Sequence, residues 1–110
     1  MVPAVDKQIG SLVLTSDYLA PTPLWVGVGA CLGRDYLERL HLPEPLVQRL
    51  LAWQELFDVH YRQEDGWDSP EAATTYEQDG HQLRSALQEA LPDSFVRLDL
   101  WPITGEAPSV

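Results

Sequence analysis

Residues 44–91 read EPLVQRLLAWQELFDVHYRQEDGWDSPEAATTYEQDGHQLRSALQEAL, and this stretch predicts two amphipathic helices joined by a short loop. In the first, from about Glu44 to Arg62, large apolar residues recur every three or four positions. They are Leu46, Leu50, Trp53, Phe57 and Tyr61. The second stripe consists of Ala72 or Ala73, Tyr76, Gly80, Leu83, Leu87 and Leu91. Because the connecting loop is short, the two helices are expected to form an antiparallel hairpin.

The second helix has a well-marked start. Ser69 is a good N-cap, Pro70 suits the first helical position, and Glu71 complements the positive end of the helix dipole. Gly80 lies within the apolar stripe, where glycine costs about 1 kcal/mol relative to alanine. We therefore expect Gly80 to pack closely against a bulky group of the first helix, for which Trp53 is the best candidate.

Strands are expected on both sides of the helix pair. Residues 9–15 are rich in apolar and β-branched types, and residues 95–101 alternate between two faces. Residues 24–29 fit either a short edge strand or an ordered loop. The predicted fold class is therefore α+β: an antiparallel helix hairpin packed on a small two- or three-stranded sheet, in the order β-(β)-α-α-β. We expect the first and last strands to pair.

The chain of 110 residues has the size of one domain. We expect that domain to span residues 9–101, between a flexible N-terminus (1–8) and a flexible tail (102–110). The single cysteine, Cys31, fits a reducing compartment. Neither a membrane-spanning apolar run nor the layout of a secretory signal is visible, so a cytoplasmic location is expected.

Seventeen acidic residues against seven basic ones give the chain a formal net charge of −10. This charge disfavours binding to nucleic acids and to anionic membranes, because both repel a negative surface. It favours rapid encounter with a basic protein. A protein partner is therefore expected, without a nucleic acid or a membrane.

No motif indicates a catalytic site, a metal or a cofactor. The glycine-rich residues 27–33 resemble a phosphate loop, but Pro43 interrupts the segment that would have to form its helix. Cys31 has no neighbouring base, and residues 64–68 match only a fragment of a calcium loop. The histidines lie roughly twenty residues apart, without a metal-binding spacing. They are His41, His60 and His81.

Residues 64–89 are the most acidic part of the chain, with a single base, Arg84. Such a stretch forms either a solvated helix face or a docking surface for a basic partner. Trp67 and Tyr76 would serve the docking surface as aromatic anchors. The candidate partner-binding residues are Glu64, Asp65, Trp67, Asp68, Glu71, Glu77 and Asp79.

The outer face of the last predicted strand is a second candidate surface. Alternation places Phe95, Arg97, Asp99 and Trp101 on that face. If no helix covers it, two large aromatic side chains are exposed, and exposed aromatic patches mark interfaces. Self-association through this face is therefore the alternative to a separate partner.

Several short motifs along the chain resemble a group of small, acidic, uncharacterised bacterial proteins. These motifs are Pro23-Leu24-Trp25, residues 50–55 (LLAWQE), residues 66–72 (GWDSPEA) and Asp79-Gly80, and the resemblance spans roughly residues 12–101. The group supplies no activity, cofactor or catalytic residue. In size, acidity and lack of a catalytic constellation, the chain is also similar to bacterial immunity proteins as a class, which neutralise toxic enzymes.

The sequence thus favours a non-enzymatic, acidic protein-binding module, such as an immunity or inhibitor protein that neutralises a basic partner. A self-associating structural domain is the alternative. A third hypothesis, a small-molecule enzyme, would use residues 24–33 with Asp17, Tyr18 and Asp35. It lacks any readable pair of nucleophile and base.

Overall fold

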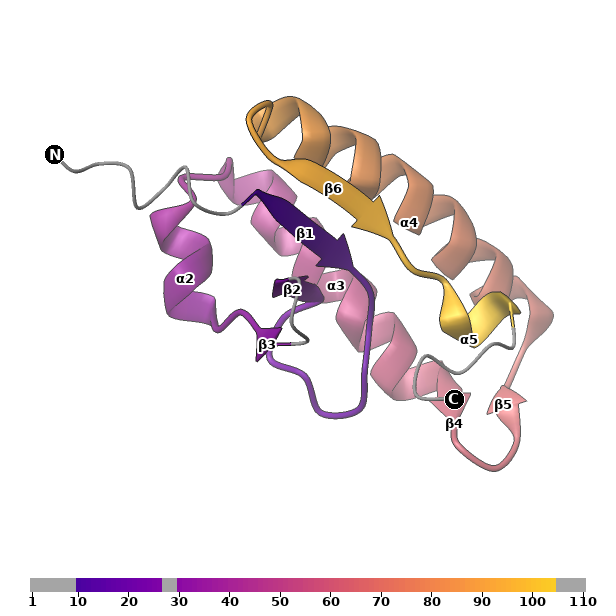
Figure 1. The fold of residues 1–110 in the computed structure, drawn as a ribbon. Helices are drawn as coiled ribbons and strands as arrows, with labels where there is room; N and C mark the ends of the chain where they lie inside the picture. The colour runs from indigo at the N-terminus through magenta and orange to yellow at the C-terminus, as the bar shows by residue number, and fades with distance from the viewer. Residues whose placement is uncertain (1–9, 27–29, 105–110) are drawn as a thin grey trace, which may run out of the picture.

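A computed structural model describes residues 10–26 and 30–104 (Figure 1). The predictions made for residues 1–8, 27–29 and 105–110 therefore lie outside the described residues. The elements follow in the order β1 (Ser11–Leu14), β2 (Leu24–Val26), β3 (Ala30–Cys31), α2 (Arg34–Arg39), α3 (Glu44–His60), β4 (Tyr61–Arg62), β5 (Gly66–Trp67), α4 (Pro70–Ala90), β6 (Phe95–Leu98) and α5 (Trp101–Thr104). The α+β class is confirmed.

The main sheet has four strands in the order β3-β2-β1-β6, so the prediction of two or three strands was too low. The first and last long strands do pair, as predicted, and they run parallel. The remaining neighbours in this sheet are antiparallel. A separate two-stranded sheet, β4-β5, joins the long helices.

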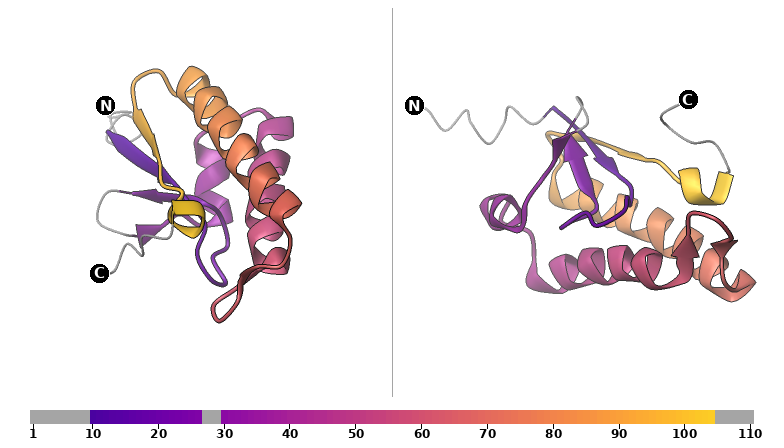
Figure 2. Two further views of the ribbon diagram at one scale, coloured as in Figure 1. Left: turned by 90° about the vertical axis from the view of Figure 1, so that its right-hand side faces the viewer. Right: turned by 90° about the horizontal axis from the view of Figure 1, so that it is seen from below.

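Helices α3 and α4 lie side by side and cover one face of the sheet (Figure 2). The first helix ends at His60, two residues earlier than predicted, because Tyr61 and Arg62 become strand β4. The start predicted for α4 is confirmed: the Ser69 hydroxyl accepts a hydrogen bond from the backbone N–H of Ala72 at 3.0 Å.

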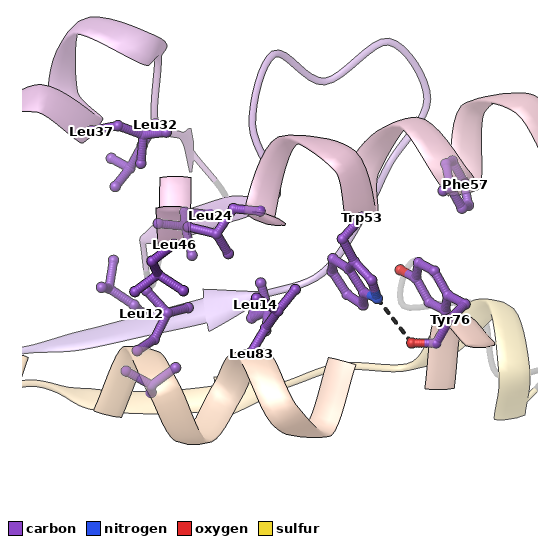
Figure 3. Close-up of a cluster of buried hydrophobic side chains, with 13 residues drawn as sticks. Leu12, Leu14, Leu24, Leu32, Leu37, Leu46, Trp53, Phe57, Tyr76 and Leu83 are labelled. Carbon is purple, nitrogen blue, oxygen red and sulfur yellow. Dashed lines mark hydrogen bonds between the residues drawn. The ribbon is translucent and has the colours of Figure 1, made fainter. Parts of the chain in front are cut away.

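The core lies between the sheet and the two helices, where both predicted stripes are buried (Figure 3). The core includes Leu12, Leu14, Leu24, Leu50, Trp53, Phe57, Tyr76, Leu83, Leu87 and Val96. The expected contact of Gly80 is confirmed, because a Cβ atom at this position would lie 3.0 Å from Cζ2 of Trp53. Glycine at position 80 thus allows the indole to reach the surface of α4.

The last strand is shorter than predicted. It ends at Leu98, and Trp101 begins the short helix α5, whose second residue, Pro102, is buried. The carboxylate of Asp99 accepts a hydrogen bond from the backbone N–H of Trp101 at 3.1 Å, which favours the start of a helix over continued strand. Asp99 and Trp101 therefore do not extend the face of β6.

Candidate partner-binding surface

The acidic candidates divide into separate groups. Glu64, Asp65 and Asp68 lie on or next to the β4-β5 hairpin, with Glu71 in the first turn of α4. Glu77 and Asp79 follow on α4, but residues two apart point about 200° apart around a helix. One continuous acidic face over residues 64–79 therefore does not form.

Asp79 faces helix α3. It lines a shallow groove of about 330 Å³ between α3 and α4, together with Arg49 and Thr75. The groove thus carries a basic as well as an acidic side chain. Asp79 is also only partly exposed. Glu77 is exposed but lies on a different side of α4, so the hairpin carries the denser negative charge.

The prediction of Tyr76 as a surface anchor was wrong, because its side chain is buried in the core. Two of the hairpin candidates make contacts within the fold. The indole N–H of Trp67 donates to the carbonyl oxygen of Pro102 at 3.2 Å, and its ring lies 5.3 Å from that of Tyr61. Asp68 pairs with Nδ1 of His60 at 3.0 Å. Glu64 and Asp65 are exposed. These two carboxylates are therefore the clearest contact points that the hairpin offers.

The loop between β1 and β2, residues 15–23, lies beside the hairpin at one end of the molecule (Figure 2). The ring of Tyr18 lies 5.4 Å from that of Phe57, 6.1 Å from Trp101 and 6.4 Å from Tyr61. Aromatic side chains from the loop, α3, β4 and α5 thus form one cluster beneath this end. The loop and the hairpin share that support.

Three successive backbone carbonyls fix the course of the loop. Thr15 accepts from the indole of Trp25 at 3.0 Å. Ser16 accepts from the indole of Trp101 at 2.9 Å, and Asp17 accepts from the side-chain amide of Gln54 at 2.9 Å. The donors belong to β2, α5 and α3 respectively. Since each bond joins a different element, the loop is held in one conformation.

Negative charge surrounds this loop. The pKa of Tyr18 is raised, first by partial burial and then by Tyr61 and the carboxylates of Asp17 and Glu64. Burial also raises the pKa of Asp58, with a further contribution from Glu55, while the hydrogen bond from Gln54 lowers it. Carboxylates from the loop, α3 and the hairpin thus lie near this end, with the bases Arg34 and Arg62 in the adjacent groove and on β4.

Leu19, which this loop exposes almost completely, was not predicted from the sequence as a binding residue. The available signal was a large aliphatic residue in a connector, between Asp17 and Pro21. An exposed leucine indicates a binding site only if its loop is ordered, and the groups that order this loop are distant in the sequence.

The self-association candidates are also dispersed. Phe95 is 58% exposed and Arg97 is exposed on the open side of β6. Trp101 instead packs against the aromatic cluster, with its ring 5.8 Å from that of Phe57. Of the two aromatic residues expected on this face, Phe95 alone lies on the strand.

The metal, thiol and small-molecule hypotheses can be compared with the structure in residues 10–26 and 30–104. Within these ranges no group of three or more His, Cys, Asp or Glu side chains could hold a metal ion. Cys31 is half-buried, and its thiol donates to the carbonyl oxygen of Thr22 at 3.3 Å. For the small-molecule hypothesis, residues 27–29 lie outside the described part, and Asp35 is exposed on α2.

None of the helices that the structure describes is both long enough and apolar enough to cross a membrane.

Comparison with known families gives a match over most of the chain. A family model described as Serratia CdiI immunity protein-like matches residues 10–97. The match runs from the residue before β1 into β6 and includes both long helices. The comparison with curated proteins gave no significant match. The matched residues thus form most of the described fold, whereas α5 lies beyond them.

Proposed function

This chain belongs to the Serratia CdiI immunity protein-like family, and from this premise we propose that it binds and neutralises the toxin domain of a CdiA-type protein. The family match over residues 10–97 is the observation that carries the proposal. An immunity protein acts by binding, which agrees with the expectation that the chain is not an enzyme. A cytoplasmic encounter fits the single thiol of Cys31.

The charge of the chain supports a basic toxin surface as the partner. A net charge of −10 accelerates encounter with a positive protein, and this effect weakens as salt rises. Within the stretch 64–79, we propose that the exposed Glu64 and Asp65 contribute most to the attraction of the basic partner. Glu71 and Glu77 add to the field from neighbouring parts of α4, and Asp79 contributes less because it is only partly exposed.

The first test is neutralisation. We expect a CdiA-type toxin gene next to the gene of this chain, and its toxin domain is the test partner. Co-expression of the chain should restore growth to cells that produce this domain, and the purified proteins should form a complex. Absence of a complex at low salt, together with undiminished toxicity, would refute the proposed function.

Charge reversal on the hairpin tests how the partner is recruited. Glu64→Lys with Asp65→Lys should lower the association rate about tenfold at low ionic strength, because steering depends on local charge. The dissociation rate should change less. Stopped-flow measurements over a salt series give both rates.

The matched control carries Glu38→Lys and Glu89→Lys. Both residues are exposed, and they lie on α2 and near the end of α4, away from the hairpin. The net charge changes by the same amount in the two double variants. Equal loss of rate in both would show that overall charge, and not the hairpin, guides association.

Self-association is the second candidate, favoured by the 58% exposure of Phe95 next to Arg97 on the open face of the sheet. If this face joins two copies, the chain should sediment as a dimer at micromolar concentration, and Phe95→Ser should return it to a monomer. Loss of one large aromatic anchor weakens an interface by roughly tenfold or more. A wild-type protein that is strictly monomeric excludes this candidate.

A further inference from the structure

The β1–β2 loop carries the most exposed large hydrophobic residue in the described part of the chain. Leu19 is 94% exposed, compared with 58% for Phe95, 50% for Val59 and 44% for Tyr18. A leucine this exposed makes almost no contribution to the core of its own chain. Burying it against a partner would remove nearly its whole side chain from water.

Leu19 is also held in an unfavourable backbone conformation. Its φ angle is +60°, in the left-handed region that glycine and asparagine adopt more readily than a bulky residue. The backbone N–H of Ala20 donates to the carbonyl oxygen of Asp17 at 3.3 Å across this turn. Because the loop is anchored before the turn by three carbonyl acceptors, the side chain is presented in an ordered position. Preorganisation of this kind lowers the entropic cost of binding.

Carboxylates lie on both sides of the loop. On one side, a groove of about 340 Å³ is lined by Ala20, Pro21, Glu55 and Asp58, together with one base, Arg34. On the other side, Glu64 of the hairpin lies near enough to Tyr18 to act on its ionisation. The charge distribution around the exposed leucine thus complements a basic surface.

We propose that Leu19 is the apolar anchor of the toxin interface and inserts into an apolar pocket on the toxin that is rimmed by lysine or arginine side chains. The proposal rests on the proposed function for the identity of the partner. The interface centre is then the loop end, with Tyr18 and the aromatic cluster beneath it and the hairpin carboxylates at its rim. Apolar anchors surrounded by polar rims are the usual arrangement of tight interfaces.

Leu19→Gly is the decisive variant, because glycine accepts the φ angle of this position and leaves the loop unstrained. We expect the dissociation constant for the purified toxin domain to rise about 30-fold, mainly through faster dissociation. The melting temperature of the free chain should stay the same or rise. Leu19→Asn, which also tolerates positive φ, should behave in the same way. Phe95→Ala is the control at the other exposed site, and it should leave affinity unchanged.

The outcomes separate this inference from the proposed function. If the wild-type chain does not bind the toxin domain, the proposed function fails. If the wild type binds and both Leu19 variants retain its affinity, the anchor is wrong while the proposed function stands. A fall in melting temperature that parallels the loss of binding, or a change in the sedimentation of the free chain on Leu19→Gly, would also overturn the anchor.

Discussion

Replacement of Trp53 by alanine is expected to lower the free energy of unfolding by about 4 kcal/mol, the cost typical of removing a large buried aromatic residue. Trp53 is 2% exposed and stacks on Tyr76, with ring centroids 4.2 Å apart and an angle of 8° between the planes. Its indole N–H also donates to the backbone carbonyl oxygen of Tyr76 at 2.8 Å (Figure 3). The truncation would leave a cavity between α3 and α4 and would remove the hydrogen bond that joins the two helices here. Urea denaturation followed by circular dichroism measures the loss.

Val59→Ala is the control on the same helix. Val59 is 50% exposed, so its truncation should change the free energy of unfolding by less than about 0.5 kcal/mol. A similar loss for both variants would mean that truncation on α3 destabilises the protein irrespective of burial, and that Trp53 has no special place in the core.

The contact of Trp53 with Gly80 can be measured by a double-mutant cycle. In the wild type, Gly80→Ala should destabilise by about 1 kcal/mol, because the new methyl group would lie 3.0 Å from an indole that cannot easily move. In a Trp53→Phe background the indole is absent, and the remaining close neighbours are the flexible ends of Leu100 and Leu98, at 3.3 Å and 3.4 Å from the new Cβ. Because these ends can shift, alanine should instead stabilise α4 by up to about 1 kcal/mol. The coupling energy is then about 2 kcal/mol. Additive effects would show that the helices relax freely around position 80.

This contact was among the features that the sequence could predict, and the reason is local. A helical period of apolar residues needs no knowledge of distant segments, and a glycine within such a stripe is unfavourable unless something large packs on it. Ser69, Pro70 and Glu71 marked the start of α4 for the same reason, because capping involves adjacent residues.

The sheet was harder to predict, since its smallest strands carry no period. β3, β4 and β5 each contain two residues, too few for alternation to be visible. The end of β6 was misplaced because Leu98, Leu100 and Trp101 continue an alternating pattern, whereas the Asp99 carboxylate bonds to the N–H of Trp101 and turns the chain into α5. A side-chain contact overrode the apolar pattern.

The candidate surface, like the end of β6, could not be predicted from local sequence patterns alone. A run of acids along a sequence is not a surface, because the helix carries Glu77 and Asp79 to different sides. The loop that presents Leu19 was missed because its anchors are remote: Gln54 is 37 residues from Asp17, and Trp101 is 85 residues from Ser16. The loop is ordered by tertiary contacts, so the role of the exposed leucine could not be predicted without the fold.

Because the phenol of Tyr76 is buried, the protein is expected to lose stability at alkaline pH. Burial raises the pKa of its phenol well above the ordinary value of 10.0, with a small addition from Asp99, and the neighbouring Ser16 offsets this in part. Among the described residues no hydrogen bond of good geometry reaches the Tyr76 hydroxyl, and the Ser16 hydroxyl is likewise unpaired. Burial therefore outweighs what Ser16 contributes, and the phenolate is disfavoured in the folded state.

The sign of the effect follows from proton binding. Below pH 10 both the folded and the unfolded chain keep the phenol protonated, so stability is fully present. Above pH 10 the unfolded chain releases this proton while the folded chain retains it, and the free energy of unfolding should fall by about 1.4 kcal/mol per pH unit. Tyr76→Phe should remove this slope and cost little at neutral pH, since the lost hydroxyl is unpaired. Urea titrations of both proteins between pH 8 and about pH 11.5 provide the comparison. Parallel curves for the wild type and Tyr76→Phe would mean that water reaches the phenol, and that the Trp53–Tyr76 stack opens far more readily than its 4.2 Å packing indicates.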